Sequence, residues 1–186
     1  MTPTWPLPGG QPVLETARLR LRPLREDDAE TVFAWASDPE VTRFVGWPRH
    51  RSLEDSRAFL RDAVDGGPLA WAWGLELKED GRLVGSTGLH DWNPDTRCAE
   101  TGYVLARAHW GRGLASETLA AMAELGFRTL GAHRLEAFCY AANAPSRRVL
   151  EKGGFACEGI HRDRAFAHGR YWDLCTYARL AEDLRS

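Results

Sequence analysis

The stretch GYVLARAHWGRGLASETL, residues 102–119, says most about the fold. It joins an apolar, strand-like run to a segment whose apolar residues recur at helical spacing from Leu114 to Leu130. Between them, small residues at 111, 113 and 115 let several backbone N–H groups approach one object, and the positive end of the following helix points the same way. A phosphate or pyrophosphate is the natural ligand. A glycine turn that binds nothing explains this segment equally well.

Two common phosphate-binding loops match this stretch poorly. A Walker loop needs Gly-Lys followed by Ser or Thr, and residues 102–119 contain no lysine. The Rossmann fingerprint needs a glycine or alanine where Ser116 stands, and an acid about 20 residues later, a place that Glu136 could fill. The strand before the loop also belongs to a hairpin-linked meander and not to a βαβ unit. A nucleotide-binding Rossmann protein is therefore the last alternative.

The rest of the chain mixes short strands with a few helices. Sequence patterns predict strands at about 18–24, 69–77, 83–90, 99–106, 133–140, 155–166 and 169–179, and helices at about 27–36, 53–64, 114–130 and 145–152. This order fits a mixed α/β or α+β fold and not βαβα winding. The prolines and glycines of residues 1–12 predict a flexible lead, followed by a single domain at 13–186.

Composition excludes several classes of protein. The 186 residues suffice for one domain, and 44% apolar with 27% charged residues are ordinary values for a globular chain. A net charge of −2 gives no overall attraction to nucleic acid or anionic membranes, and no segment approaches the roughly 18 apolar residues that span a bilayer. The four cysteines form no C-x-x-C pair, which favours buried free thiols over a metal site. A cytoplasmic protein without nucleic-acid or membrane partners is expected.

Several segments in order resemble the GNAT superfamily of acetyl-CoA-dependent N-acetyltransferases, in particular the ribosomal-protein-alanine N-acetyltransferases. The resembling segments are ETARLRLRPLREDDAE (15–30), SDPEVTRFV (37–45), GYVLARAHWGRGLASETL (102–119), NAPSRRVLEKGGF (143–155) and EGIHRDRAFAHGRYWDL (158–174). Each is weak alone, but together they cover nearly the whole chain after residue 13. The resemblance implies a single-domain GNAT-like fold with a central mixed, mostly antiparallel sheet of about seven strands flanked by about four helices.

The resemblance also implies a site for acetyl-CoA, without any metal. The family's loop pattern is Gln or Arg, two residues, Gly, one residue, then Gly or Ala; Gly113 and Ala115 match, and Trp110 departs at the first position. Loop amides would hold the pyrophosphate, and the edge of a splayed strand would pair with pantetheine. The implied contacts come from Val104, Leu105, Gly111, Arg112, Gly113, Leu114, Ala115, Ser116 and Asn143. For Asn143, a purely structural role as a helix N-cap is at least as good an explanation.

The catalytic residues are harder to assign. Glu100 is the expected general base, because related acetyltransferases often carry a glutamate in this strand, although an ordinary exposed strand residue explains it equally well. Many family members use a tyrosine as general acid just before the Glu-Lys of the short helix, and that position is Leu150 here. The role of acid therefore shifts to Ser146, although a serine hydroxyl is intrinsically a poor acid. The glutamate of the last hairpin in the ribosomal-protein branch falls at Ala165.

The acceptor site is expected across the sheet from the cofactor, with walls from Arg43, Phe44, Trp47 and Trp92. The resulting hypothesis is an N-acetyltransferase in which a primary amine attacks acetyl-CoA directly in a ternary complex. A protein N-terminal α-amine is the favoured acceptor; a small-molecule amine is the alternative within enzymes, and a non-catalytic CoA-binding module is the alternative outside them. The sequence leaves a homodimer open.

Overall fold

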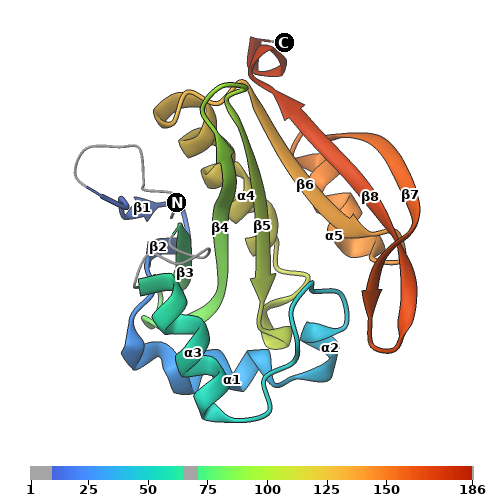
Figure 1. Ribbon diagram of the computed structural model, residues 1–186. Coiled ribbons are helices and arrows are strands. Elements are labelled where there is room, and N and C mark those ends of the chain that lie inside the picture. Colours follow the sequence, from blue (N-terminus) through green and yellow to red (C-terminus); the bar gives the residue numbers. More distant parts are fainter. Residues whose placement is uncertain (1–9, 65–70, 186) are drawn as a thin grey trace.

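The computed structural model describes residues 10–64 and 71–185. Eight strands form one sheet (Figure 1): β1 (Leu14–Glu15), β2 (Leu19–Pro23), β3 (Ala72–Leu77), β4 (Leu83–Asn93), β5 (Cys98–Leu105), β6 (Arg134–Tyr140), β7 (Ala156–Ala167) and β8 (Arg170–Leu180). The helices are α1 (Ala29–Ala36), α2 (Pro39–Thr42), α3 (Leu53–Val64), α4 (Leu114–Glu124) and α5 (Ala144–Lys152). Most of the predicted lead, 1–12, and the predicted strand start at 69 and 70 lie outside the described residues.

The sheet is mixed and mostly antiparallel, as expected. Its order is β1-β2-β3-β4-β5-β6-β8-β7, and only β5 and β6 are parallel neighbours among the described strands. The eighth strand is the two-residue β1, too short for an alternating pattern to reveal. The short helix α2 was also not expected, because Asp38-Pro39 predicts a helix end. The same pair begins α2: Pro39 tolerates the first helical turn, and the Asp38 carboxylate accepts the Glu40 N–H at 2.8 Å.

The long helix predicted at 114–130 is divided. Regular α4 ends at Glu124, and a π-helical turn, Leu125–Thr129, follows it with a Leu130 N–H to Leu125 carbonyl bond of 2.9 Å. Gly126 lies in this turn, where a β-carbon would come within 2.9 Å of the Leu135 side chain. The wider turn accompanies this close packing of helix on strand, a tertiary contact that helical spacing does not encode.

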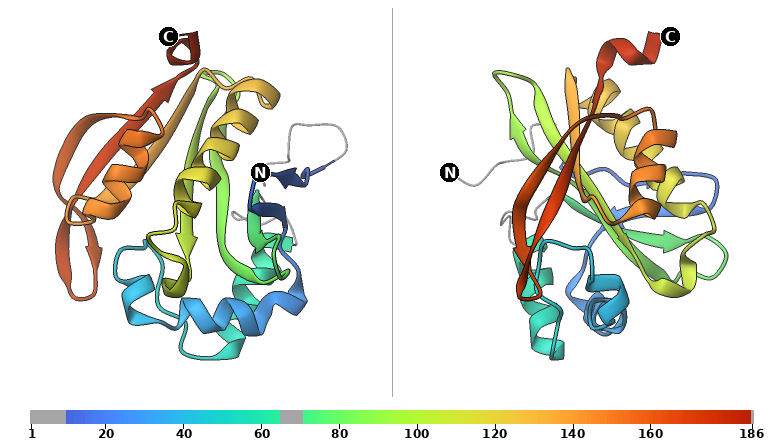
Figure 2. Two further views of the ribbon diagram at one scale, coloured as in Figure 1. Left: turned by 180° about the vertical axis from the view of Figure 1, so that it is seen from behind. Right: turned by 90° about the vertical axis from the view of Figure 1, so that its right-hand side faces the viewer.

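The core lies on both faces of the sheet. Helices α4 and α5 cover one face, and α1 and α3 cover the other towards one end (Figure 2). Trp71 and Trp73 are 4% and 0% exposed and belong to this core. All four cysteines are free, but Cys157 is exposed on the edge strand β7, so the prediction of buried thiols is wrong there. Within the described residues, every helix is too short or too polar to cross a bilayer.

The parallel strands β5 and β6 are paired along only part of their length. They pair only at Cys98–Arg134, Ala99–Leu135 and Glu100–Glu136. Beyond Glu100, β5 stays paired with β4 while β6 stays paired with β8, so a wedge opens between them (Figure 1). This is the splay expected from the family resemblance. It leaves one edge of β5 without a partner strand.

Candidate active site

The open edge of β5 presents backbone groups to the wedge. The Ala106 N–H donates to the Val84 carbonyl at 2.8 Å, which makes this cross-strand position a hydrogen-bonded pair with β4. Such pairs alternate along an antiparallel ladder, so Val104 also turns its backbone towards β4, whereas Tyr103 and Leu105 turn theirs into the wedge. Of the two residues expected to contact the cofactor, Leu105 therefore turns its backbone into the wedge and Val104 turns its backbone towards β4. The Leu105 carbonyl already accepts the Trp110 indole N–H at 2.8 Å.

The glycine loop ends at the bare N-terminus of α4. Gly111 and Gly113 have φ of 72° and 77°, values that favour glycine, and Gly113 is the N-cap without any side-chain capping bond. The first helical carbonyl bond is from the Glu117 N–H to Gly113, at 3.2 Å. The N–H groups of residues 114–116 therefore have no acceptor among the described residues, which is the arrangement that binds anions at helix N-termini.

A network from the first sheet strands fixes this loop in place. The Arg18 Nε donates to the Glu117 carboxylate at 2.8 Å, and the Arg18 Nη1 donates to the Arg112 carbonyl at 2.7 Å. The Arg112 side chain turns to His109, with Nη1 and the imidazole Nδ1 at 3.1 Å, and to Glu79. Because both loop and helix are held from outside, their amides are oriented before any ligand arrives.

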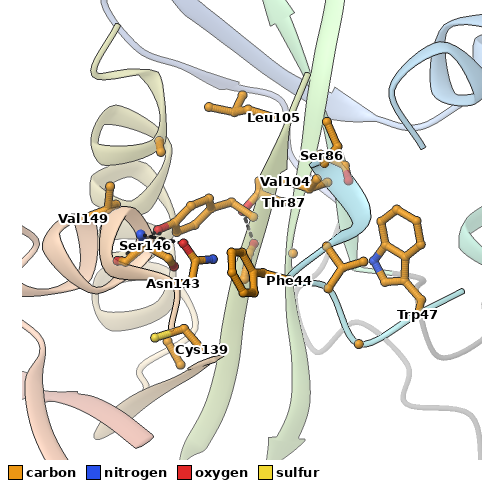
Figure 3. Close-up of a pocket in the computed structure, with 18 of the residues that line it drawn as sticks. Phe44, Trp47, Ser86, Thr87, Val104, Leu105, Cys139, Asn143, Ser146 and Val149 are labelled. Carbon is orange, nitrogen blue, oxygen red and sulfur yellow. Dashed lines mark hydrogen bonds between the residues drawn. The ribbon is translucent and has the colours of Figure 1, made fainter. Parts of the chain in front are cut away.

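One cavity of about 1370 Å³ runs from this loop through the wedge to the opposite face of the sheet. Figure 3 shows Cys139, Asn143, Ser146 and Val149 on one side of it, with Phe44 and Trp47 on the other. All the sequence-predicted site residues line it except Glu100, Trp92 and Arg112. Trp92 packs against the core instead.

The N-terminus of α5 brings a hydroxyl pair into the cavity. The Asn143 Oδ1 accepts the Ser146 N–H at 3.2 Å and so caps the helix, which leaves the amide nitrogen of Asn143 unused among the described residues. The Ser146 Oγ lies 3.1 Å from the hydroxyl of Tyr103 on β5. Sequence reasoning missed Tyr103. Its position in the strand next to the glycine loop was visible, but its contact with a helix 43 residues away was not.

Burial keeps the protons on two groups that line this part of the cavity. It raises the pKa of Tyr103 to about 12, against a smaller lowering by the bond to Ser146. It also raises the pKa of the Cys139 thiol to about 12, with a further contribution from Cys175. At neutral pH both are uncharged, so Tyr103 is a hydrogen-bond donor and Cys139 is a weak nucleophile.

Glu100 lies just before the wedge, in the last pair that β5 makes with β6. Burial raises its pKa from 4.5 to about 7, with further contributions from Asp91 and Glu136. Directly opposite on β4 is His90, which sequence reasoning missed and which lines the cavity. Burial lowers the pKa of His90. A β-carbon at Gly88 would lie 3.3 Å from its imidazole, so glycine there makes room for the ring.

Aromatic rings form the wall on the acceptor side. Phe44 packs edge-on against Trp172 with ring centroids 5.6 Å apart, and Trp47 packs against His50 at 5.4 Å. The His168 ring nitrogen Nε2 lies 3.1 Å from the Thr42 carbonyl, which joins the β7–β8 turn to α2. The segment after α1 and the last hairpin thus contact each other, and of the two only the segment after α1 lines the cavity among the described residues.

Comparisons with known proteins agree with this geometry. The family model of the acetyltransferase (GNAT) domain matches residues 18–156. The chain is 35% identical over 169 residues to the uncharacterized N-acetyltransferase YoaA of Bacillus subtilis, covering 90% of this chain and 96% of that protein. It is 27% identical to the ribosomal-protein-serine acetyltransferase of Escherichia coli over 74% of this chain and 78% of that one.

Solved structures share the fold. A GNAT-family acetyltransferase from Bacillus anthracis superposes with a TM-score of 0.83 at 29% identity, over 92% of this chain and 99% of the other. A spermidine N-acetyltransferase from Vibrio cholerae, solved with CoA and spermine, superposes with a TM-score of 0.79 at 20% identity, over 90% and 98% of the two chains. The proteins that share this fold are thus named for different amine acceptors.

Proposed function

This chain belongs to the GNAT family of acetyltransferases, and from that premise we propose that its cavity serves direct attack of a primary amine on acetyl-CoA, with a protein N-terminal α-amine as acceptor. The observation that carries this proposal is the continuous cavity through the wedge, with unused backbone donors at one end and aromatic walls at the other. The catalytic domain is taken as residues 13–186. Glu100, Arg112 and Trp92 do not line the cavity, so in this proposal they do not touch the substrates directly.

The residues at the loop end fit coenzyme A. The three unused N–H groups of residues 114–116 suit a pyrophosphate, and the wedge-facing backbone of Tyr103 and Leu105 suits the amides of pantetheine. The unused amide nitrogen of Asn143 is a further donor beside them. When bound, acetyl-CoA supplies a thioester carbonyl that an amine can attack.

Two groups of this chain then handle protons. Glu100, with a pKa of about 7, accepts the proton of the amine, and it does so through water because it does not line the cavity. Ser146, at the start of α5, donates to the sulfur that leaves. Cys139 forms no acetyl-enzyme, because its raised pKa keeps the thiol protonated.

An α-amine needs less help than other acceptors. From reference pKa values, roughly a tenth of an α-amino group is neutral at pH 7, against less than a thousandth of a lysine side chain. The cavity also carries Arg43, Arg49 and Arg51 on its acceptor side, while the Asp55 carboxylate there accepts the backbone N–H groups of Arg51 and Ser52. Glu40 and Asp91 line the cavity as well, and Arg43 faces Glu40 at 4.0 Å, so the preference for an α-amine rests on its larger neutral fraction and not on the lining charges.

Thiol release with a panel of amines tests the proposal. The panel holds a peptide with a free α-amine, the same peptide blocked at its N-terminus but carrying a lysine, and spermidine. We expect release with the first, and a single acetyl group on its N-terminus by mass spectrometry. Release with spermidine alone would make the protein a small-molecule acetyltransferase. No release from any amine, with acetyl-CoA still raising the melting temperature, would make it a CoA-binding module.

A further inference from the structure

The contact between Tyr103 and Ser146 joins the two sides of the wedge. Tyr103 comes from the open edge strand β5, and Ser146 comes from the first turn of α5 beyond β6. Their hydroxyl oxygens are 3.1 Å apart, and both residues line the cavity. Tyr103 is also the only tyrosine among the described residues that line it. The Tyr103 hydroxyl also lies 3.5 Å from the Ser146 backbone carbonyl, so both of its contacts are with the first turn of α5.

We propose that Tyr103 is the proton source for the departing thiol, acting through Ser146. This inference rests on the proposed function and identifies a residue that works behind Ser146 in the same site.

The proposed step balances without any further reactant. The amine nitrogen forms a bond to the carbonyl carbon, and the carbon–sulfur bond breaks with its electron pair on sulfur. The Ser146 hydroxyl gives its proton to that sulfur as the Tyr103 hydroxyl gives its proton to the Ser146 oxygen. Glu100 takes the proton lost by the amine and releases it to solvent, from which the Tyr103 oxygen regains a proton. Both hydroxyls are thereby restored, and the products are an amide and a free thiol.

Acidity explains why a serine needs such a partner. An alkyl hydroxyl is a very weak acid, whereas an unperturbed tyrosine has a pKa near 10, by its reference value. Burial of Tyr103 raises its pKa to about 12, which keeps the proton in place at neutral pH yet leaves the phenol a better donor than serine alone. Cys139 also lines the cavity but has no hydrogen bond to Ser146.

A double-mutant cycle tests the coupling of the two hydroxyls. We expect Tyr103→Phe and Ser146→Ala each to lower kcat about 10- to 100-fold, the lower part of the usual range for acid–base catalysis. The KM for acetyl-CoA should change by less than about threefold, because neither hydroxyl makes uniform binding contacts. The double variant should be no slower than Ser146→Ala, since groups that act as one unit are not additive. Effects that multiply would overturn the proposal.

A control and a changed leaving group separate chemistry from structure. Tyr177→Phe removes another buried hydroxyl that contacts α5, through Arg147 and Glu151, but does not line the cavity, and it should retain wild-type kcat. The selenium analogue of acetyl-CoA releases a more acidic selenol, so the loss in Tyr103→Phe should shrink at least severalfold. An equal loss with both donors contradicts the inference. If the wild type releases no thiol with any amine, the proposed function fails first.

Discussion

The fold disfavours the ionised form of the Glu100 carboxyl group. Its pKa rises from 4.5 to about 7 because burial and the nearby carboxylates of Asp91 and Glu136 disfavour ionisation. A carboxyl group whose pKa is raised on folding binds its proton more tightly in the folded state. Stability is therefore lost as the pH rises from about 4.5 to about 7 and stays lost above that range.

Replacing Glu100 with glutamine removes this cost and keeps the shape of the side chain. Above pH 7, Glu100→Gln should be more stable than the wild type by about 1 kcal/mol after allowance for solvent screening, or roughly 2–4 °C in melting temperature. Below pH 4.5 the two melting temperatures should converge. Thermal melts at pH 4 and pH 8 measure the difference. A variant that melts lower than the wild type at pH 8 would refute the burial argument.

The same residue should shape the pH dependence of the reaction. If Glu100 is the base, kcat/KM of the wild type rises with pH through a group of pKa about 7, and the Glu100→Gln variant lacks this limb. The variant's deficit should be largest just above pH 7, because below it the wild-type carboxylate is protonated, and well above it the amine loses its proton without help. A variant that keeps the limb would assign the base elsewhere, with His90 the next residue to change.

Some of the individual site residues could be predicted from the sequence. Gly113 was identified by the spacing of small residues, and Asn143 and Ser146 by the family resemblance; all three line the cavity. Tyr103 and His90 were missed because their importance comes from neighbours across the fold: a helix in one case and a glycine-lined strand face in the other. Along β5, alternate residues direct their backbone groups to β4 or into the wedge. That Tyr103 and not Val104 faces the wedge depends on the register with β4, which the sequence of β5 alone does not show.

The loop and α4 act as one preformed element. Gly113 needs its positive φ of 77° to end the loop and to point the following amides into the cavity. We expect Gly113→Ala to cost about 1–2 kcal/mol of stability from backbone strain. It should also weaken acetyl-CoA binding at least tenfold, because the amides move.

Gly81 provides the matched control for that substitution. It has a φ of 71° and open space around it, in the β3–β4 turn, and does not line the cavity. Gly81→Ala should lose similar stability but bind acetyl-CoA as the wild type does. Calorimetric titration of both variants measures the affinity. Equal losses of affinity would mean that the loop amides are not the binding site.

A buried ion pair ties the first helical segment to the sheet. Arg22 is 6% exposed, and its guanidinium holds Asp28 through two bonds of 2.9 and 2.8 Å, and Glu76 through a third of 2.7 Å. Arg22→Met would leave the buried Asp28 carboxylate without its charged partner. We expect a loss of about 3–5 kcal/mol in the free energy of unfolding.

The exposed pair between Arg82 and Asp80 shows how much burial matters. Arg82 is 70% exposed at its side chain, so Arg82→Met should cost much less stability than Arg22→Met. Denaturant unfolding of both variants compares the two pairs. A loss below about 1 kcal/mol for Arg22→Met would show that the Arg22 network contributes no more than a surface pair.

Long patterned elements were predictable, and short or strained ones were not. The helix at 53–64 was predicted at its observed bounds, since its apolar face and capping residues are local features. The π-helical turn after α4 and the brief β1 and α2 depend on packing against other elements. The wedge itself followed only from the family resemblance, because the end of strand pairing leaves no mark in the pattern of β5 or β6.

At the scale of the whole molecule, the wedge explains how a nearly neutral protein can receive a highly anionic co-substrate. A net charge of −2 supplies no general attraction. In this account, oriented N–H groups at one end of the cavity bind the anion in place of a general electrostatic attraction, and the acceptor binds at the other end. The proposed direct attack requires both substrates in this cavity together.

Initial rates of thiol release, with acetyl-CoA and the peptide amine both varied, test this most directly. A ternary complex predicts that the lines of a double-reciprocal plot intersect, and that Cys139→Ala keeps the same pattern. Parallel lines, with acetyl groups found on Cys139 after incubation with acetyl-CoA alone, would instead indicate a covalent acetyl-enzyme. That result would contradict the central claim that the amine attacks acetyl-CoA directly.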